Sequence, residues 1–69
     1  MIRYHEYHYW CVYRDAYVAR VSVVDKNGRE FFQIVTRDGR GYRERREKAV
    51  EACCDAIDQG CDPGEVRLA

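Results

Sequence analysis

The chain has 69 residues, of which 46% are hydrophobic, and its twelve basic residues balance its twelve acidic ones. A chain of this length forms one domain, residues 1–69, near the lower size limit for an independent core. The pI of about 6.7 argues against a protein that binds nucleic acid mainly through phosphates, since such domains usually carry a clear positive excess. No stretch approaches transmembrane length. Residues 1–9 lack the apolar run of a signal peptide, so we expect a cytoplasmic protein.

Three segments rich in Tyr, Val, Trp and Phe alternate apolar with polar residues, which predicts β-strands over 7–14, 17–25 and 30–36. Asp15-Ala16 is the expected connection between the first two strands. Asn27-Gly28 is the strongest short hairpin signal, because a two-residue turn needs positive φ at both central positions.

The second hairpin predicts which side chains face the core. With Asn27-Gly28 as the loop, Val24 lies opposite Phe31 and Val21 lies opposite Ile34. The predicted core face then contains Ala19, Val21, Val23, Phe32 and Ile34. The predicted outer face contains Val18, Arg20, Ser22, Val24, Phe31, Gln33 and Val35.

The first hairpin extends this pattern to residues 7–14. A turn at Asp15-Ala16 places His8, Trp10 and Val12 on the core face. The same turn points four side chains outward: Tyr7, Tyr9, Cys11 and Tyr13. A three-residue loop at this turn reverses the two faces, because a shift of one residue exchanges them. The sequence leaves open which face of this strand is buried.

A helix is predicted over residues 42–59, after a flexible loop at 37–41. Its apolar stripe has 3.6-residue spacing and consists of Tyr42, Ala49, Val50, Cys53, Ala56 and Ile57. Gly60 is the expected C-cap, 62–64 forms a turn, and residues 65–68 form a short edge strand or coil. The predicted fold is an α+β, two-layer domain: a three-stranded antiparallel β-meander packed against one C-terminal α-helix.

The charges of this helix run against its own dipole, since arginines crowd its first turn and acids follow behind. Five acids fall within about 80° of arc on the side away from the apolar stripe; they are Glu44, Glu47, Glu51, Asp55 and Asp58. We call these five residues the acidic ridge. Such a ridge imitates a phosphate strand and fits a groove lined with Lys and Arg. The alternative is an ordinary solvated helix face.

An arginine-rich segment runs from this loop into the start of the helix and contains Arg37, Arg40, Arg43, Arg45 and Arg46. Guanidinium groups suit phosphate contacts, and a glycine-containing loop at a helix start exposes backbone N–H groups. The residues 39–41 match no phosphate-binding loop signature. A solvated loop explains the same pattern, with Arg46 lying along the core edge by its aliphatic stem.

The outward tyrosines Tyr7, Tyr9 and Tyr13 form a third candidate surface. Exposed Tyr clusters are typical of protein interfaces and also stack on unpaired bases. The alternative is that the C-terminal tail or a second copy of the chain covers them.

Catalytic and metal chemistry is not indicated. His5 and His8 are three residues apart, so on a strand they point to opposite faces. No Cys-x₂-Cys pair or Ser/His/Asp set is present, and we expect no enzyme, no cofactor and no metal. The four cysteines are expected to be reduced, although the sequence does not decide whether Cys54 and Cys61 pair across the turn at Gly60.

Three strands followed by a helix resemble, in topology alone, the arm-type DNA-binding domains of tyrosine recombinases and the plant ethylene-response-factor domains. That resemblance implies groove contacts by Tyr9, Arg20 and Gln33. Residues 39–57 also resemble the end of a double-stranded RNA-binding domain. In size and composition the chain resembles small phage-encoded accessory proteins, including anti-CRISPR proteins, which are compact, non-catalytic and often acidic on the working face.

Our leading hypothesis is therefore a phage-type inhibitor of a protein or ribonucleoprotein nuclease complex such as a CRISPR effector. The acidic ridge would occupy the nucleic-acid groove, and Tyr7, Tyr9 and Tyr13 would add apolar area. The second hypothesis is a DNA- or RNA-binding module that uses the outer sheet face and Arg20, Arg40, Arg43 and Arg46. The third is a structural protein that dimerises through open sheet edges. The sequence does not distinguish a monomer from a weak homodimer, and it indicates no membrane partner.

Overall fold

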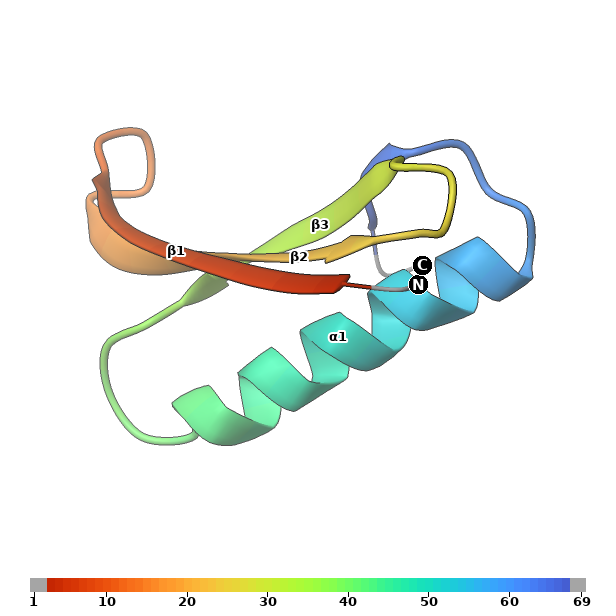
Figure 1. Cartoon of the computed structure of the whole chain (residues 1–69). Helices are drawn as coiled ribbons and strands as arrows, with labels where there is room; N and C mark the ends of the chain where they lie inside the picture. Colours follow the sequence, from red (N-terminus) through yellow and green to blue (C-terminus); the bar gives the residue numbers. More distant parts are fainter. Residues whose placement is uncertain (1–2, 68–69) are drawn as a thin grey trace.

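The structure, a computed structural model, describes residues 3–67 as a twisted sheet with one helix along one face (Figure 1). The elements in chain order are β1 (Arg3–Cys11), β2 (Ala16–Val24), β3 (Glu30–Thr36), α1 (Tyr42–Asp58) and β4 (Gly64–Glu65). The strands lie side by side in the order β1-β2-β3-β4. The predicted α+β class is confirmed. The sheet itself is a correction, because it has four strands and is mixed rather than purely antiparallel.

The fourth strand arises from the tail. β4 runs parallel to β3, and the Val66 N–H donates to the Phe32 carbonyl at 2.8 Å. The side-chain amide of Gln33 also donates to the Val66 carbonyl at 2.9 Å. Of the two alternatives for the tail, the short edge strand is confirmed for Glu65. The last residue of that prediction, Leu68, lies outside the described residues.

Small side chains let α1 lie close against β2 and β3. Ala49, Cys53 and Ala56 are buried at the helix–sheet contact, and Val50 and Ile57 flank them. The helix ends at Asp58 with Gln59 as its C-cap, one residue before the predicted end. The predicted apolar stripe is confirmed.

The second hairpin differs from its prediction by one residue. The Gly28 N–H donates to the Asp25 carbonyl and the Asp25 N–H to the Arg29 carbonyl, so the loop contains three residues rather than two. Within this loop, only Gly28 takes a positive φ, at +81°. Asp25 favours this longer loop, because its carboxylate accepts the N–H groups of Asn27 and Arg29, both at 2.9 Å.

The longer loop reverses the faces of β3. Val23 lies opposite Phe31 and Ser22 opposite Phe32, so Phe31 rather than Phe32 packs on Cys53 in the core. Val35, not Ile34, joins Ala19 and Val21 beneath the helix. The predicted core positions of Phe32 and Ile34 were therefore wrong, whereas those of Ala19, Val21 and Val23 are confirmed.

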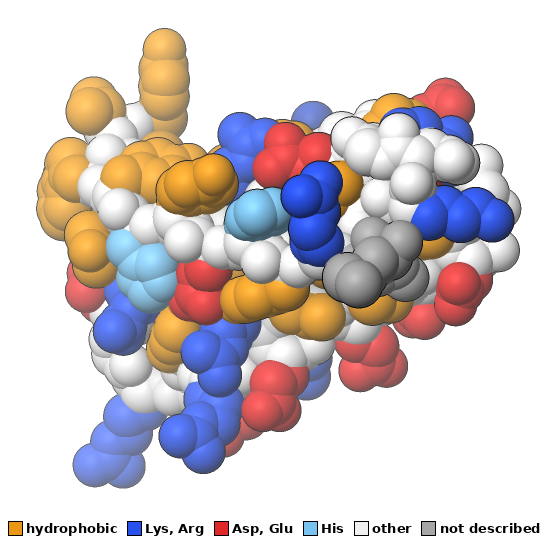
Figure 2. All heavy atoms as spheres, in the orientation of Figure 1, with side chains coloured by type: hydrophobic (Ala, Val, Ile, Leu, Met, Phe, Trp, Pro, Cys, Tyr) orange, Lys and Arg blue, Asp and Glu red, His pale blue; other side chains and the backbone are white. Residues whose placement is uncertain are grey.

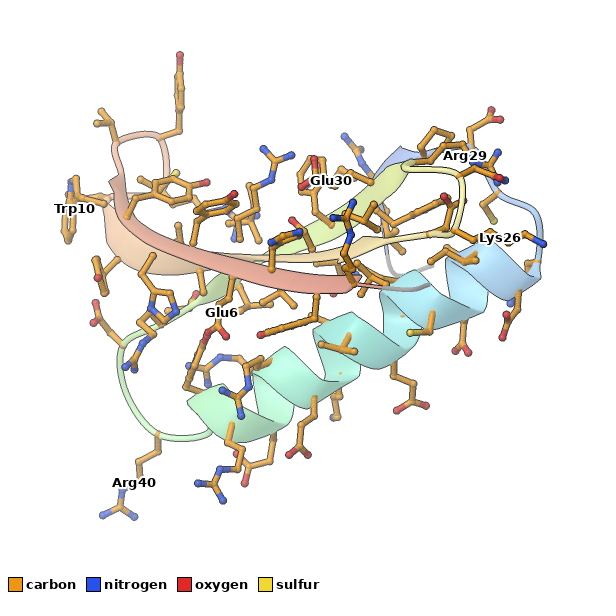
Figure 3. The ribbon with its side chains drawn as sticks, in the orientation of Figure 1. Glu6, Trp10, Lys26, Arg29, Glu30 and Arg40 are labelled. Atoms are coloured by element: carbon orange, nitrogen blue, oxygen red, sulfur yellow. The ribbon has the colours of Figure 1, made fainter. Side chains whose placement is uncertain are left out.

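The first hairpin turns over residues 12–15 instead of at Asp15-Ala16. Asp15 takes a left-handed conformation with φ +50°, and its N–H donates to the Val12 carbonyl; Asp tolerates that conformation better than most residues. This register keeps His8 and Trp10 on the helix side as predicted, but Val12 lies in the exposed turn. Trp10 remains 56% exposed, because α1 covers β2 and β3 and does not reach Trp10 (Figure 3).

Candidate functional site

All five residues of the acidic ridge are exposed on the side of α1 that faces away from the sheet. Within residues 3–67, no Lys, Arg or His nitrogen lies within 4.0 Å of any of these carboxylates. The structure therefore brings together all five predicted residues, which are Glu44, Glu47, Glu51, Asp55 and Asp58. Like charges at i,i+4 spacing cost a helix a few tenths of a kcal/mol each, and no described cation offsets that cost by direct contact.

The N-terminal end of α1 is basic. Figure 2 shows Lys and Arg side chains gathered around the loop and the first turns, with acids along the rest of the helix. Arg40 and Arg43 are exposed, and Arg40 projects away from the loop (Figure 3). These two residues are the part of the predicted arginine set that is free to meet a partner.

The other two predicted nucleic-acid contacts are engaged within the domain. Arg20 pairs with Glu30 at 2.9 Å and lies 3.7 Å above the Phe32 ring. Arg46 lies 3.9 Å from the Glu6 carboxylate and over the ring of Tyr42. The structure thus does not bring Arg20, Arg40, Arg43 and Arg46 together as one surface.

Arg45 orders the loop that precedes the helix. Its guanidinium donates to the carbonyls of Thr36 (2.8 Å), Asp38 (3.1 Å) and Arg40 (2.7 Å). One side chain satisfies a carbonyl at the end of β3 and two carbonyls in the loop. Arg45 therefore has a structural role that its place in an arginine-rich segment does not reveal.

The tyrosine surface lies apart from the acidic ridge. Tyr7 and Tyr9 are on the sheet face opposite the helix, 59% and 37% exposed, and Tyr13 is fully exposed in the first turn. One flat partner surface cannot contact both these tyrosines and the ridge, because the two layers of the domain separate them. The predicted partner-binding residues therefore lie on two different sides of the domain.

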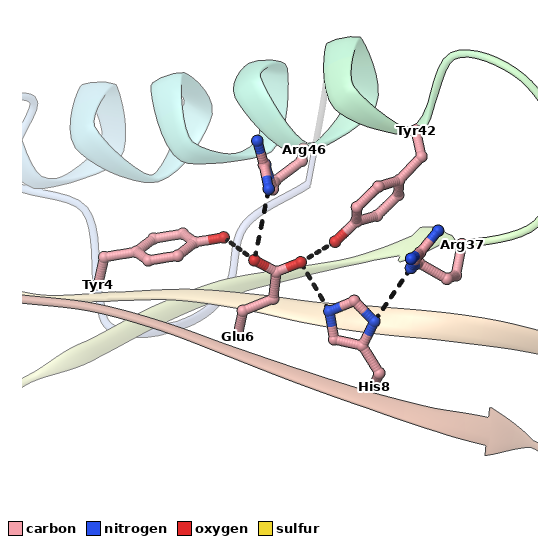
Figure 4. Close-up of polar contacts among 6 residues, drawn as sticks. All are labelled: Tyr4, Glu6, His8, Arg37, Tyr42 and Arg46. Carbon is pink, nitrogen blue, oxygen red and sulfur yellow. Dashed lines mark hydrogen bonds and ion pairs between the residues drawn. The ribbon is translucent and has the colours of Figure 1, made fainter.

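A polar cluster joins β1 to the start of the helix, and sequence reasoning missed it (Figure 4). Glu6 is at its centre and accepts hydrogen bonds from the hydroxyls of Tyr4 and Tyr42. The ring nitrogen Nε2 of His8 lies 2.7 Å from the same carboxylate, and Arg37 Nε donates to His8 Nδ1 at 3.1 Å. His8 thus lies between the Glu6 carboxylate and the Arg37 guanidinium.

These contacts determine the ionisation of the cluster. Burial alone raises the pKa of Glu6, but hydrogen bonds from Tyr4, Tyr42 and His8 outweigh it and lower that pKa to about 2. Burial, followed by the hydrogen bond to Glu6, raises the pKa of Tyr42 to about 12. The same two causes raise the pKa of Tyr4. Glu6 is therefore an ionised carboxylate that already accepts several hydrogen bonds. This suits a structural contact between the sheet and the helix better than a role as a general base.

A signal for the cluster exists in the sequence. Tyr4, Glu6 and His8 alternate at the strand period, so they share one face once the strand is extended to Arg3. The predicted strand began at residue 7 and excluded two of the three.

We expect Glu6→Ala to lower the free energy of unfolding by about 1–3 kcal/mol, because it leaves two tyrosine hydroxyls without their charged acceptor. A folded-state pKa below the ordinary value of 4.5 adds stability that is fully present above that pH and is lost as the pH falls towards about 2. Urea unfolding of wild type and Glu6→Gln from pH 7 to pH 2 measures this. His5→Ala, on the opposite face of β1, is the control. Equal pH profiles of the unfolding free energy for wild type and Glu6→Gln would contradict this structural role of Glu6.

The cysteines and histidines form no metal centre in the described part of the chain. All four cysteines are free thiols, and residues 3–67 contain no group of three His, Cys, Asp or Glu arranged to hold a metal. Burial, with a smaller contribution from Cys54, raises the pKa of the Cys53 thiol to about 11. Cys53 is therefore a small core residue.

Comparison with protein-family models, curated proteins and solved structures finds no match. Among the described residues, α1 is too short and too polar to cross a membrane.

Proposed function

We propose that the chain is a small non-catalytic inhibitor that binds a protein or ribonucleoprotein nuclease complex. In this proposal the acidic ridge enters a groove that normally holds nucleic acid, and so blocks it. The observation that carries the proposal is the row of five exposed carboxylates on one side of α1, which make no ion pair within residues 3–67. The resemblance to small phage proteins favours a CRISPR effector in the bacterial cytoplasm as the target, which would make this an anti-CRISPR-type protein.

The dimensions of the ridge support mimicry of a phosphate strand. From Glu44 to Asp58 the helix rises about 21 Å, at 1.5 Å per residue. One strand of duplex DNA carries a charge every 3.4 Å of axis, or roughly six over that length. Five carboxylates in a line therefore approach the linear charge of the ligand that they would replace.

The absence of internal pairing also supports the proposal. A carboxylate already bound to a guanidinium must break that contact before it meets a partner, whereas the ridge residues have no such contact among the described residues. Fields of complementary sign speed the encounter with a basic groove and fix its orientation.

A second candidate is a nucleic-acid-binding module, because Arg40 and Arg43 are exposed at the N-terminal end of α1. A helix N-terminus together with two free guanidiniums can hold a phosphate. Two contacts give only weak affinity, and Arg20 and Arg46 are occupied elsewhere, so we place this function second.

A displacement experiment separates the two candidates. Added protein should release labelled nucleic acid from a purified CRISPR effector, and should itself bind neither naked duplex DNA nor RNA at about 50 mM salt. Displacement should persist in the Arg40→Ala/Arg43→Ala variant. Direct binding to the naked nucleic acid that weakens steeply with salt, and that this variant loses, would replace the inhibitor proposal with the second candidate.

A further inference from the structure

The two edges of the sheet are protected to very different degrees. At the β3 edge, the Phe32 carbonyl accepts from Val66, and the Ile34 carbonyl accepts from the Arg14 guanidinium at 3.1 Å. The Thr36 carbonyl accepts from Arg45. This edge is therefore covered by β4 and by two arginine side chains, which is a common way of preventing edge-to-edge association.

The β1 edge has no such cover among residues 3–67. The Tyr17 carbonyl accepts from the Arg37 N–H, so Tyr17 directs its backbone groups towards β3. Since backbone direction alternates along an antiparallel strand, Ala16 and Val18 face β1. Their partners Cys11 and Tyr9 face back, and the intervening β1 residues point their N–H and C=O groups outwards. These outward residues are Tyr4, Glu6, His8 and Trp10.

β1 has few of the features that prevent strand addition, and its charged residues are Arg3 and Glu6. Its pairing with β2 is unbroken over nine residues, with no bulge, and the strand contains no Pro or Lys. Aromatic side chains remain exposed on both of its faces: Tyr4 by 45%, Tyr7 by 59%, Tyr9 by 37% and Trp10 by 56%. Long, regular, aromatic edges of this kind are expected to be paired in solution.

We propose that β1 pairs antiparallel with β1 of a second copy of this chain, about a two-fold axis at Tyr7. In this register the residues whose backbone N–H and C=O groups point away from β2 lie opposite one another, as an antiparallel ladder requires. Tyr4 lies opposite Trp10 of the second copy, and Glu6 lies opposite His8 of the second copy. Tyr7 lies opposite itself. The result is one continuous sheet across both copies, in a closed dimer.

The charge pattern selects this register over its neighbours. A two-fold axis at Glu6 would place two carboxylates directly opposite each other, which is unfavourable. An axis at His8 would set Glu6 against an indole and shorten the overlap. The axis at Tyr7 uses the whole span of Arg3–Cys11 and places no two like charges opposite each other.

The exposed area indicates a dimer of moderate strength. Four half-exposed aromatic side chains supply on the order of 400 Å² per copy, about half the area that one partner contributes to a standard interface. We therefore expect a dissociation constant in the micromolar range. The acidic ridge lies on α1, away from this edge, so the dimer and the proposed function are independent of each other.

Sedimentation equilibrium from about 5 to 500 μM tests the dimer. The mass of the wild type should rise from 8.2 kDa towards twice that value. Tyr7→Lys and Tyr7→Glu should each weaken association at least about tenfold, because each places like charges opposite each other at the axis. An equimolar mixture of the two variants should restore the dimer. Residue 7 lies opposite residue 7 of the second copy, so the mixture places a Lys opposite a Glu. Far-UV circular dichroism checks that the variants fold.

Tyr13→Lys is the matched control, since it makes the same substitution at a fully exposed tyrosine in the turn. It should associate like the wild type. A monomeric wild type at every concentration would overturn the proposal. So would unchanged association of Tyr7→Lys, or a mixture of the two Tyr7 variants that stays monomeric.

Discussion

Phe31→Ala should destabilise the domain by about 3–5 kcal/mol, the range found for truncating a buried Phe. Phe31 is fully buried, in a cluster with Val23, Cys53 and Ala56. A domain of 69 residues has a total stability of roughly 3–10 kcal/mol. The variant is therefore expected to be largely unfolded at 37 °C.

Phe32→Ala is the matched control, because it removes the same side chain from the next residue. Phe32 is only partly buried on the outer face, beneath the Arg20 guanidinium. Its truncation should cost about 1–2 kcal/mol, from lost apolar area and the cation–π contact. Urea unfolding followed by circular dichroism measures both values. A larger loss for Phe32→Ala would contradict the three-residue loop and support the register predicted from Asn27-Gly28.

The helix could be predicted from the sequence because its signals are local. Ala49, Cys53 and Ala56 recur at the helical period, and Gly60 follows the last turn. The acidic ridge follows from the same periodicity, since its residues are placed by the helix alone. Their exposure is confirmed, whereas their role stays a prediction.

The β3 register could not be predicted from the turn dipeptide. The two candidate loops differ by one residue, and the side chain of Asp25, outside the dipeptide, stabilises the longer one through the N–H groups of Asn27 and Arg29. Both β3 faces carry apolar residues, so hydrophobic alternation does not choose between them. One short-range contact thus decided which phenylalanine entered the core.

The contact between the polar cluster on β1 and the helix could not be predicted, for a different reason. Glu6 and Tyr42 are 36 residues apart and meet only after the helix has crossed the sheet. Similarly, the contact of Arg14 with the Ile34 carbonyl spans 20 residues. A motif search finds residues that act together when they are close in sequence, and these are not.

Reversal of the ridge charges should abolish inhibition. The change is Glu47→Lys, Glu51→Lys and Asp55→Lys together, which adds two charges at each of three sites and takes the net charge from 0 to about +6. Lysines at these positions repel one another as the acids do, so helix stability should change little. Binding to a basic groove should weaken by more than about 100-fold, since close charge pairs across interfaces are worth several kcal/mol.

The control variant changes the same number of charges elsewhere, at Asp38, Asp62 and Glu65, each replaced by Lys. All three residues are exposed and lie outside α1. It has the same net charge as the ridge variant, so it separates the position of the charge from its total.

The inhibition constants of these three proteins, measured against one CRISPR effector that cleaves a labelled substrate, test directly whether the acidic ridge blocks the groove. We expect the wild type and the control variant to inhibit equally well and the ridge variant to leave cleavage untouched. Undiminished inhibition by the ridge variant, with its fold intact, would show that the carboxylates on α1 do not make the contact.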